Sequence, residues 1–207
     1  SLRRRTLRRA VWQLRRSLRD VSFSPIEQAR LVAEEGQVGA RSTLPGDLVL
    51  VLEYDTLLLH GSEWKRQVSA PQLLGEAVRT LPVPGSVRLD NGWQIQATYH
   101  ERAKITASQR ALDAWRECID AEKAGRLTLR ARRSGERMQP FGLQGHSAKI
   151  ADIMINEKVP AYLRARWPIV ANERHAVWIP GLVLDDRVRV NEKTHGVIQL
   201  RCSRVGA

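Results

Sequence analysis

Apolar residues near the start of the chain recur at the spacing of an α-helix. Leu7, Val11, Leu14 and Leu18 are four, three and four positions apart, which puts them on one side of a helix. A second helix is predicted to begin at 24–27, where Ser caps the first turn, Pro is tolerated, and Glu completes a capping box. A glycine at position 36 is expected to end this helix.

Short apolar runs between turn residues predict two β-hairpins in the middle of the chain. The first covers residues 48–60 and follows a turn at 44–47 that contains Pro45-Gly46. The second covers residues 87–98, with Asn91-Gly92 as its turn. Residues 108–119 are predicted to be helical.

Strand and helix patterns alternate in the last third. From Arg126 onward, Leu127, Leu129 and Ala131 alternate with polar residues, as in a half-buried strand. Ser147 is expected to cap a helix that carries Ile150, Ile153 and Met154 on one face, and a second short helix should run from Pro160 to Pro168. Further strands are predicted at 176–179, 187–190 and 197–203, and Cys202 should face the core in the last of them.

These patterns predict an α+β fold. An N-terminal helical segment with β-hairpins is followed by a strand-rich, layered C-terminal domain. We place the domain boundary after residue 110, with a substrate-binding domain at 1–110 and a second domain at 111–207. The chain opens with Ser1 inside a helical pattern and has no initiator Met, so we interpret it as a piece of something longer.

Charge is unevenly distributed. The net charge is +12, and residues 1–20 contain eight arginines against one acid. Residues 126–207 contain 15 basic and seven acidic residues, whereas the middle of the chain is mildly acidic. Segregated basic surface is typical of nucleic-acid binding, although a solvated surface would have the same composition. The N-terminal arginines are interpreted either as the solvated face of a packed helix or as neighbours of phosphates.

No self-contained active site is recognisable. The sequence has no phosphate-binding glycine loop of the P-loop type, no GxGxxG and no HExxH. The five histidines share no metal-ligand spacing, so no metal is predicted, and no catalytic triad can be selected. The two cysteines are far apart and are expected to be free thiols in a reducing cytoplasm. No apolar run approaches a membrane span. A binding module is favoured.

Basic residues around a glycine turn form the candidate RNA site. Arginine can bind phosphate oxygens through two parallel hydrogen bonds, and lysine offers a mobile charge. The candidate tRNA-binding residues are Arg130, Arg132, Arg133, Arg137, Lys149, Lys158, Arg164 and Arg166. The six tryptophans are expected to lie mainly in the core, with base stacking as an alternative role for Trp167.

The order of short motifs in residues 126–181 resembles the C-terminal part of the tRNA(Ile)-lysidine synthetase family. The matching positions are Arg132, Gly135-Glu136-Arg137-Met138, Pro140, Gly142, Gly145, Lys149-Ile150, Asp152, Lys158-Val159-Pro160, Arg164, Pro168 and Ala176-Val177-Trp178-Ile179-Pro180-Gly181. A looser match covers the arginine-rich start, Ile26-Glu27, Leu44-Pro45-Gly46 and Glu53-Tyr54-Asp55. The chain departs from the family at Ala148, Ala151 and Ile153-Met154, where lysines or aromatic residues are frequent.

The resemblance implies a reaction. The family uses ATP to adenylate C2 of the wobble cytidine in a tRNA(Ile) with a CAU anticodon, and the lysine amine then displaces AMP. The family's ATP site, with its Mg, carries an SGGxDS motif in an N-terminal domain, and this motif is absent here. The resemblance thus implies a tRNA-recognition fragment that needs no cofactor of its own. The implied fold is similar to a domain of the phenylalanyl-tRNA synthetase β subunit.

The sequence leaves two alternatives open. The first is a non-catalytic RNA-binding module of a synthetase-like protein, which a sequence upstream with SGGxDS would exclude. The second is an enzyme complete in these residues, which the missing motifs disfavour. The expected partner is tRNA(Ile), the expected compartment is the cytoplasm, and a homodimer is left open.

Overall fold

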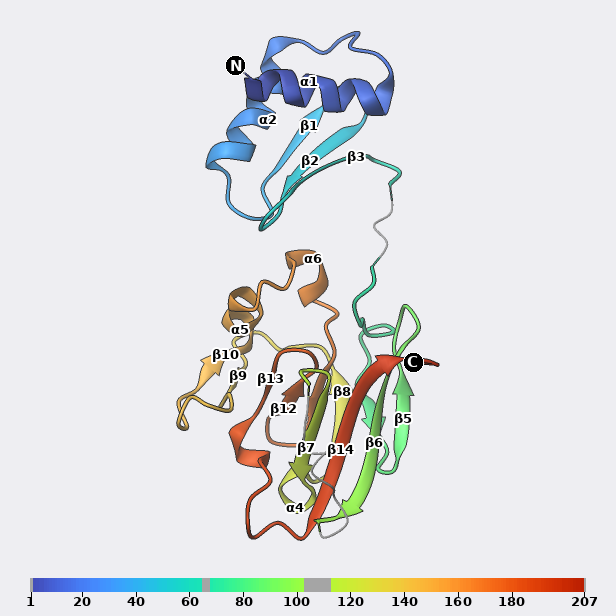
Figure 1. Cartoon of the computed structure of the whole chain (residues 1–207), viewed down its shortest axis with the longest axis vertical. Helices are drawn as coiled ribbons and strands as arrows, with labels where there is room; N and C mark the ends of the chain where they lie inside the picture. Colours follow the sequence, from blue (N-terminus) through green and yellow to red (C-terminus); the bar gives the residue numbers. More distant parts are fainter. Residues whose placement is uncertain (1, 65–67, 103–112, 207) are drawn as a thin grey trace. The chain divides into compact units, whose positions relative to one another are not determined.

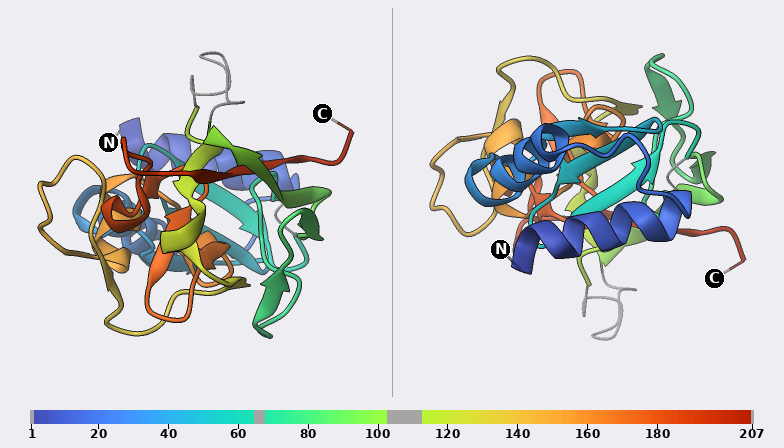
Figure 2. Two further views of the ribbon diagram at one scale, coloured as in Figure 1. Left: turned by 90° about the horizontal axis from the view of Figure 1, so that it is seen from below. Right: turned by 90° about the horizontal axis from the view of Figure 1, so that it is seen from above.

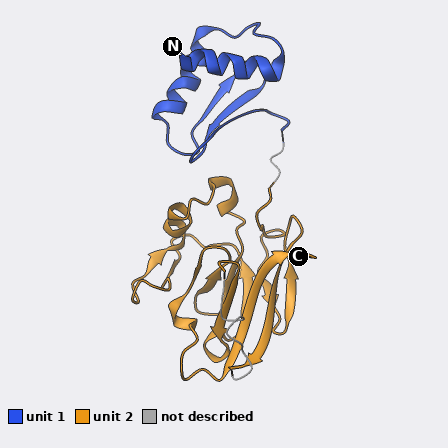
Figure 3. Cartoon of the chain, viewed as in Figure 1, with its two compact units in different colours: residues 1–67 blue, residues 68–207 orange. Residues whose placement is uncertain are grey.

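The computed structural model describes residues 2–64, 68–102 and 113–206. The chain divides into two compact units, Ser1–Gln67 and Val68–Ala207 (Figure 3). We call them unit 1 and unit 2. The expected boundary after residue 110 lies outside the described residues, and strands on both sides of it pair within unit 2. The boundary is therefore corrected to the segment around residue 67.

Unit 1 consists of two helices packed on a three-stranded sheet. The helices are α1 (Leu2–Arg15) and α2 (Phe23–Glu35), and the antiparallel strands are β1 (Arg41–Leu44), β2 (Leu48–Leu52) and β3 (Leu57–Gly61). Leu7 and Val11 of α1 are buried with Ile26 of α2 and Leu50 of the sheet. The predicted hairpin at 48–60 is confirmed as β2 and β3.

Two helix predictions in unit 1 need correction. The apolar stripe of the first helix is shorter than expected, because Leu14 and Leu18 are 53% and 40% exposed. The helix ends at Arg15, and Arg16 adopts a left-handed backbone conformation. The second helix starts at Phe23 rather than after Ser24, with Ser22 in the N-cap position, and it ends at Gly36 as predicted.

Unit 2 is built from two antiparallel sheets with a core between them. The five-stranded sheet has the order β13-β12-β11-β8-β4, and the four-stranded sheet has the order β5-β6-β14-β7 (Figure 1). Their bounds are β4 Arg79–Leu81, β5 Gly85–Arg88, β6 Trp93–Glu101, β7 Arg116–Asp120, β8 Leu127–Arg130, β11 Ile169–Ala171, β12 Ala176–Ile179, β13 Val183–Leu184 and β14 Gly196–Arg204. The expected α+β fold with a layered, strand-rich C-terminal part is confirmed.

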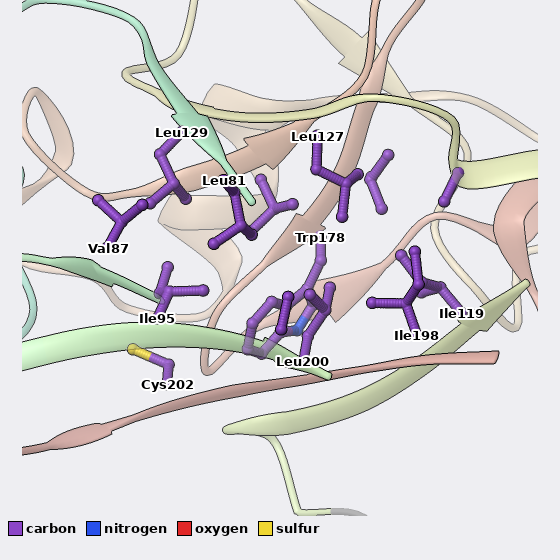
Figure 4. Close-up of a cluster of buried hydrophobic side chains, with 14 of the residues drawn as sticks. Leu81, Val87, Ile95, Ile119, Leu127, Leu129, Trp178, Ile198, Leu200 and Cys202 are labelled. Carbon is purple, nitrogen blue, oxygen red and sulfur yellow. The ribbon is translucent and has the colours of Figure 1, made fainter. Parts of the chain in front are cut away.

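The core between the two sheets explains several sequence patterns (Figure 4). Leu127 and Leu129 face this core from β8, as their alternation predicted. Trp178 of β12 is fully buried there. Cys202 lies opposite Ile95 in the β14–β6 pair and is 2% exposed, so its predicted core position is confirmed.

Two element predictions in unit 2 are wrong. Of the helix expected at 108–119, residues 108–112 lie outside the described residues, and the rest includes strand β7. The first half of the strand expected at 187–190 belongs instead to a 3₁₀ turn, η2 (Asp186–Val188). The carboxylate of Asp185 accepts a hydrogen bond from the backbone N–H of Arg187, which stabilises the turn.

The second side of the five-stranded sheet is covered by short helices. They are α5 (Ile150–Asn156) and α6 (Ala161–Arg164). Met154 and Leu163 pack with Ile169 and Ile179 of the sheet. The helix α4 (Ala121–Ala124) follows β7 and contacts the other sheet instead. A two-stranded ribbon of β9 (Arg137–Met138) and β10 (Ala148–Lys149) leads into α5. No helix among residues 2–64, 68–102 and 113–206 is long and apolar enough to span a membrane.

Candidate nucleic-acid interface

All eight candidate cations lie in unit 2, between β8 and the segment that follows α6. In Figure 1 this part of the chain passes from β8 through the β9–β10 ribbon to α5 and α6. The structure separates the eight into two groups. Some are held by contacts within the protein, and others present their charge to solvent.

Arg130 belongs to the interior, which corrects its expected contact with tRNA. Its side chain is 6% exposed and forms an ion pair with Glu136, whose side chain is 11% exposed. Arg130 Nη1 donates to Glu136 Oε2 at 2.9 Å, and its Nη2 donates to Glu136 Oε1. A guanidinium with both edges engaged inside the protein has no free face for phosphate.

This ion pair also shapes the glycine turn. Burial raises the pKa of Glu136, but hydrogen bonds from Arg130 and from the backbone N–H of Arg133 outweigh it, so the pKa is lowered overall. The Glu136 carboxylate therefore stays charged and holds the turn at Arg133 at 2.9 Å. Gly135 has φ +68°, which a glycine adopts without strain. Arg133 is exposed on this turn, and Arg132 beside it is half-buried, with its Nε making no hydrogen bond to the described residues.

Arg137 and Lys149 are direct cross-strand partners on the β9–β10 ribbon. Both side chains are exposed. Like charges placed directly opposite each other destabilise a strand pair, so an anion between or over them would be favoured. Arg137 Nε donates to Ser147 Oγ at 2.9 Å and its Nη2 donates to the Ser147 carbonyl at 2.7 Å, which fixes the guanidinium beside the ribbon.

Ser147 therefore does not cap the following helix. The N-cap of α5 is Lys149, which makes no side-chain capping bond. The predicted apolar face of this helix is confirmed, because Ile150 and Met154 are buried and Ile153 packs against the same cluster. Lys149 thus joins the end of the ribbon to the first turn of a helix that is anchored in the core.

Lys158 occupies a position where glycine is usual. The N–H of Lys158 donates to the Ile155 carbonyl at 2.9 Å, and the N–H of Val159 donates to the Met154 carbonyl at 2.8 Å. These two bonds form a Schellman motif at the end of α5. The residue at its left-handed position is Lys158, with φ +54°. A side chain with a Cβ costs about 1–2 kcal/mol there.

Arg164 and Arg166 mainly fix the chain around α6. Arg164 Nε donates to the Val159 carbonyl at 2.7 Å. Arg166 donates to the Leu73 carbonyl and forms an ion pair with Asp90 at 3.0 Å. The expected tRNA contacts of these two residues stay predictions, because the Arg166 side chain is still 50% exposed.

Sequence reasoning missed some exposed aromatic residues. Phe141 is 53% exposed at the start of a fully exposed loop, and Arg189 lies 5.5 Å from its ring centroid. Trp12 in unit 1 is 45% exposed. Trp167 is 6% exposed and donates to the Pro180 carbonyl, so its stacking role is excluded and its core role is confirmed. Helical spacing was the available signal for Trp12, because it lies opposite the buried stripe.

Besides Arg166, the exposed candidates are Arg133, Arg137, Lys149 and Lys158, which follow the glycine turn, the ribbon and the end of α5. Two exposed acids, Asp152 and Glu157, lie on or beside the same helix and reduce its net charge. The arrangement places several exposed cations along one stretch of backbone. Such a surface can hold a polyanion.

Comparison with known proteins shows which family this chain is similar to. Residues 127–202 match the family model of the TilS substrate C-terminal domain. A tRNA(Ile)-lysidine synthase of Dehalococcoides mccartyi is 26% identical over 208 residues, covering 100% of this chain and 42% of that protein. The chain matches the C-terminal part of the tRNA(Ile)-lysidine synthase family.

Other relatives agree. The tRNA(Ile)-lysidine synthase of Bacillus subtilis is 32% identical over 168 residues, covering 78% of this chain and 33% of that protein. The crystal structure of a TilS C-terminal domain superposes with a TM-score of 0.55 at 28% identity, covering 63% of this chain and 98% of that one. The chain thus spans less than half the length of these lysidine synthases.

Proposed function

We propose that this chain is the tRNA-recognition part of a tRNA(Ile)-lysidine synthase. In the complete enzyme, lysine would be joined to the wobble cytidine of a tRNA(Ile) with a CAU anticodon at the expense of ATP. The observation that carries the proposal is the opposition of Arg137 and Lys149 on a short ribbon, in a domain that matches this family.

The phosphate backbone is the natural partner of this surface. Fixed cations neutralise phosphates and release counterions, which is the main source of affinity in many RNA complexes. The Arg137 guanidinium is held in place by Ser147, so binding immobilises little further freedom of this side chain, and the ribbon fixes the backbone of Lys149. The site therefore suits positioning of tRNA rather than chemistry on it.

The adenylation step belongs, in this proposal, to the portion of the relatives that the chain does not cover. ATP with Mg would bind there, next to an SGGxDS motif that does not occur in these residues. We also propose a cytoplasmic location, where tRNA is modified and where the free thiols of Cys118 and Cys202 stay reduced.

Binding of the chain to tRNA(Ile) with a CAU anticodon, compared with a second tRNA of similar length, tests the proposal. Fluorescence anisotropy at several salt concentrations gives both the affinity and its salt slope. We expect tighter binding of tRNA(Ile), with log K falling by about 0.7–0.9 per phosphate neutralised. Equal affinity for both tRNAs would favour a general RNA-binding module, and a flat salt response would exclude phosphate contact as the main source of affinity.

A second measurement tests whether the chain alone can carry out the adenylation step. The chain is incubated with ATP, lysine and tRNA(Ile), and release of AMP is followed. We expect no AMP above background, because the sequence contains neither the SGGxDS motif nor a P-loop. Clear turnover by the pure chain would mean that these residues contain an active site of their own.

A further inference from the structure

The arginines of α1 fall into distinct groups, and most have partners inside unit 1. Arg3 forms an ion pair with Glu34 at 2.8 Å. Arg4 Nε donates to Glu27 at 2.6 Å. Both acids lie on α2, so these two arginines join the helices to each other. Their charges are locally balanced.

Two more arginines bind backbone carbonyls after the helix. Arg8 Nη2 donates to the Val21 carbonyl at 3.0 Å. Arg15 Nη1 donates to the Arg19 carbonyl at 3.3 Å, and its guanidinium packs against Gly46, where a Cβ would meet Nε at 2.2 Å. These side chains hold the connection between α1 and α2 and the turn between β1 and β2. Their placement is structural.

The two remaining arginines of α1, Arg5 and Arg9, form a stripe with Trp12 on the outer side of the helix. Arg5, Arg9 and Trp12 are four and three positions apart on α1, so they share one face. Arg16 follows the end of the helix and lies beside the Trp12 ring, and all four residues are exposed. Leu7 and Val11 lie on the opposite side, buried in the core of unit 1. The right-hand view in Figure 2 shows α1 on the outside of its sheet.

The stripe combines cations with an exposed aromatic ring. The N–H of Arg16 donates to the Trp12 carbonyl at 2.7 Å, and its Cζ lies 5.3 Å from the Trp12 ring centroid. Arg5 and Arg9 are like charges at i,i+4, an arrangement that destabilises an isolated helix. Phosphates would relieve this repulsion, and a flat base would use the indole face.

We propose that this stripe, Arg5-Arg9-Trp12-Arg16, is a second RNA contact, which binds an unpaired nucleotide of the tRNA and its flanking phosphates. The unpaired base stacks on Trp12, while Arg5 and Arg9 bind phosphates along the outer face. A paired base inside a duplex has no free face for the indole, so the contact selects a single-stranded stretch. The identity of the RNA as tRNA rests on the proposed function, whereas the stripe itself rests on unit 1 alone.

An anionic membrane surface fits these residues less well. A helix that lies on a membrane buries a broad apolar face between the headgroups. Leu7 and Val11 of the apolar face of α1 are already buried in the core of unit 1, and Leu14 is exposed only at the end of that face. What α1 presents outward is a cationic stripe with a single aromatic residue.

Three variants of the full chain test the stripe, with two probes. The probes are an unstructured single-stranded RNA of about ten nucleotides and tRNA(Ile). Trp12→Ala should weaken binding of the single strand at least about fivefold, while Trp12→Phe, which keeps an aromatic face, stays within about twofold. Arg5→Gln/Arg9→Gln should reduce the salt slope for tRNA by about 1.4–1.8, twice the value for one phosphate.

The matched control is Arg19→Gln/Arg41→Gln, which removes the same charge from exposed positions of unit 1. It should leave the salt slope nearly unchanged. Wild-type affinity of both Trp12→Ala and the Arg5/Arg9 variant, in a chain that binds tRNA(Ile), would overturn the stripe and leave the proposed function standing. Failure of the wild-type chain to bind tRNA(Ile) would instead overturn the proposed function. Trp12-dependent binding to phosphatidylserine vesicles, without RNA binding, would assign the stripe to a membrane and overturn the inference.

Discussion

The guanidinium of Arg130 and the carboxylate of Glu136 are joined by two hydrogen bonds in the interior of unit 2. Removing one partner of a buried pair leaves the other charge without compensation and costs about 3–5 kcal/mol. Arg130→Ala should therefore lower the free energy of unfolding by roughly this amount in urea denaturation. Arg133→Ala, at an exposed neighbour, should change it by less than about 0.5 kcal/mol. An Arg130→Ala protein with full stability but lost tRNA binding would restore Arg130 as an RNA contact.

Replacing Lys158 by Gly or by Ala distinguishes the effect of its backbone strain on stability from the effect of its charge on tRNA binding. Lys158→Gly removes the left-handed strain of about 1–2 kcal/mol, while the greater freedom of glycine in the unfolded chain takes back about 0.4–1 kcal/mol. We expect a small gain in stability together with weaker tRNA binding and a salt slope lower by about 0.7–0.9. Lys158→Ala should weaken binding equally without the gain in stability. Unchanged binding in both variants would show that the lysine serves no RNA contact.

Short-range features of the fold could be predicted from the sequence. Pro45-Gly46 and Asn91-Gly92 specify turns by their own backbone preferences, and they join β1 to β2 and β5 to β6. The hairpin expected at 48–60 also formed, as β2 and β3. The alternation that placed Cys202 in the core depends only on the pleat of one strand. The family resemblance could also be recognised, because the order of motifs is a property of the sequence itself.

Long-range relationships could not be predicted in the same way. The pairing of β14 with both β6 and β7 depends on how distant strands meet, so the domain boundary was misplaced. Arg130 occupied a polar position of an alternating pattern, and nothing local indicated that Glu136 would bind it in the interior. The left-handed backbone of Lys158 follows from the helix end, which the sequence placed only approximately.

Lowering the pH should destabilise unit 1, because Glu27 becomes protonated and loses its ion pairs. Hydrogen bonds from Arg4 and then Arg30 lower the pKa of Glu27 to about 2. Because the folded state holds this carboxylate charged, its contribution is complete above about pH 4.5 and is lost as pH falls toward 2. Hydrogen exchange of α2 amides between pH 5 and 2.5 should show progressive loss of protection in the wild type. Glu27→Gln should flatten this dependence and Glu35→Gln, on the same helix, should not.

Raising the pH should destabilise unit 2, because Glu117 loses its proton. Burial raises the pKa of Glu117 to about 7. The folded state therefore favours the protonated form, and stability falls as pH rises from about 4.5 to 7. Glu117→Gln removes that loss, so its melting temperature should exceed the wild-type value by more at pH 8 than at pH 5. Glu122→Gln, an exposed substitution on α4, should show no such trend. An equal effect of Glu117→Gln at both pH values would contradict the raised pKa.

The location of the main tRNA site is tested by two triple variants with equal loss of charge. Arg137, Lys149 and Lys158 are replaced by Ala in one, and Arg126, Arg174 and Lys193 in the other; all six are exposed in unit 2. Arg3 and Arg4 are unsuitable as controls, because they pair with Glu34 and Glu27 and their loss would disturb unit 1 itself.

The first triple variant should bind tRNA(Ile) at least about tenfold more weakly, because each well-placed charged hydrogen bond contributes about 1.5–3 kcal/mol. Its cations lie on backbone that the ribbon and the end of α5 hold in place, so little backbone entropy is lost when they bind. The second variant should lose less than about threefold, the effect of weaker general attraction. Melting curves establish that both proteins remain folded. If the second variant loses more affinity, tRNA lies instead over the hollow of about 530 Å³ that Lys123, Arg126 and Arg174 line, and the ribbon is not the principal site.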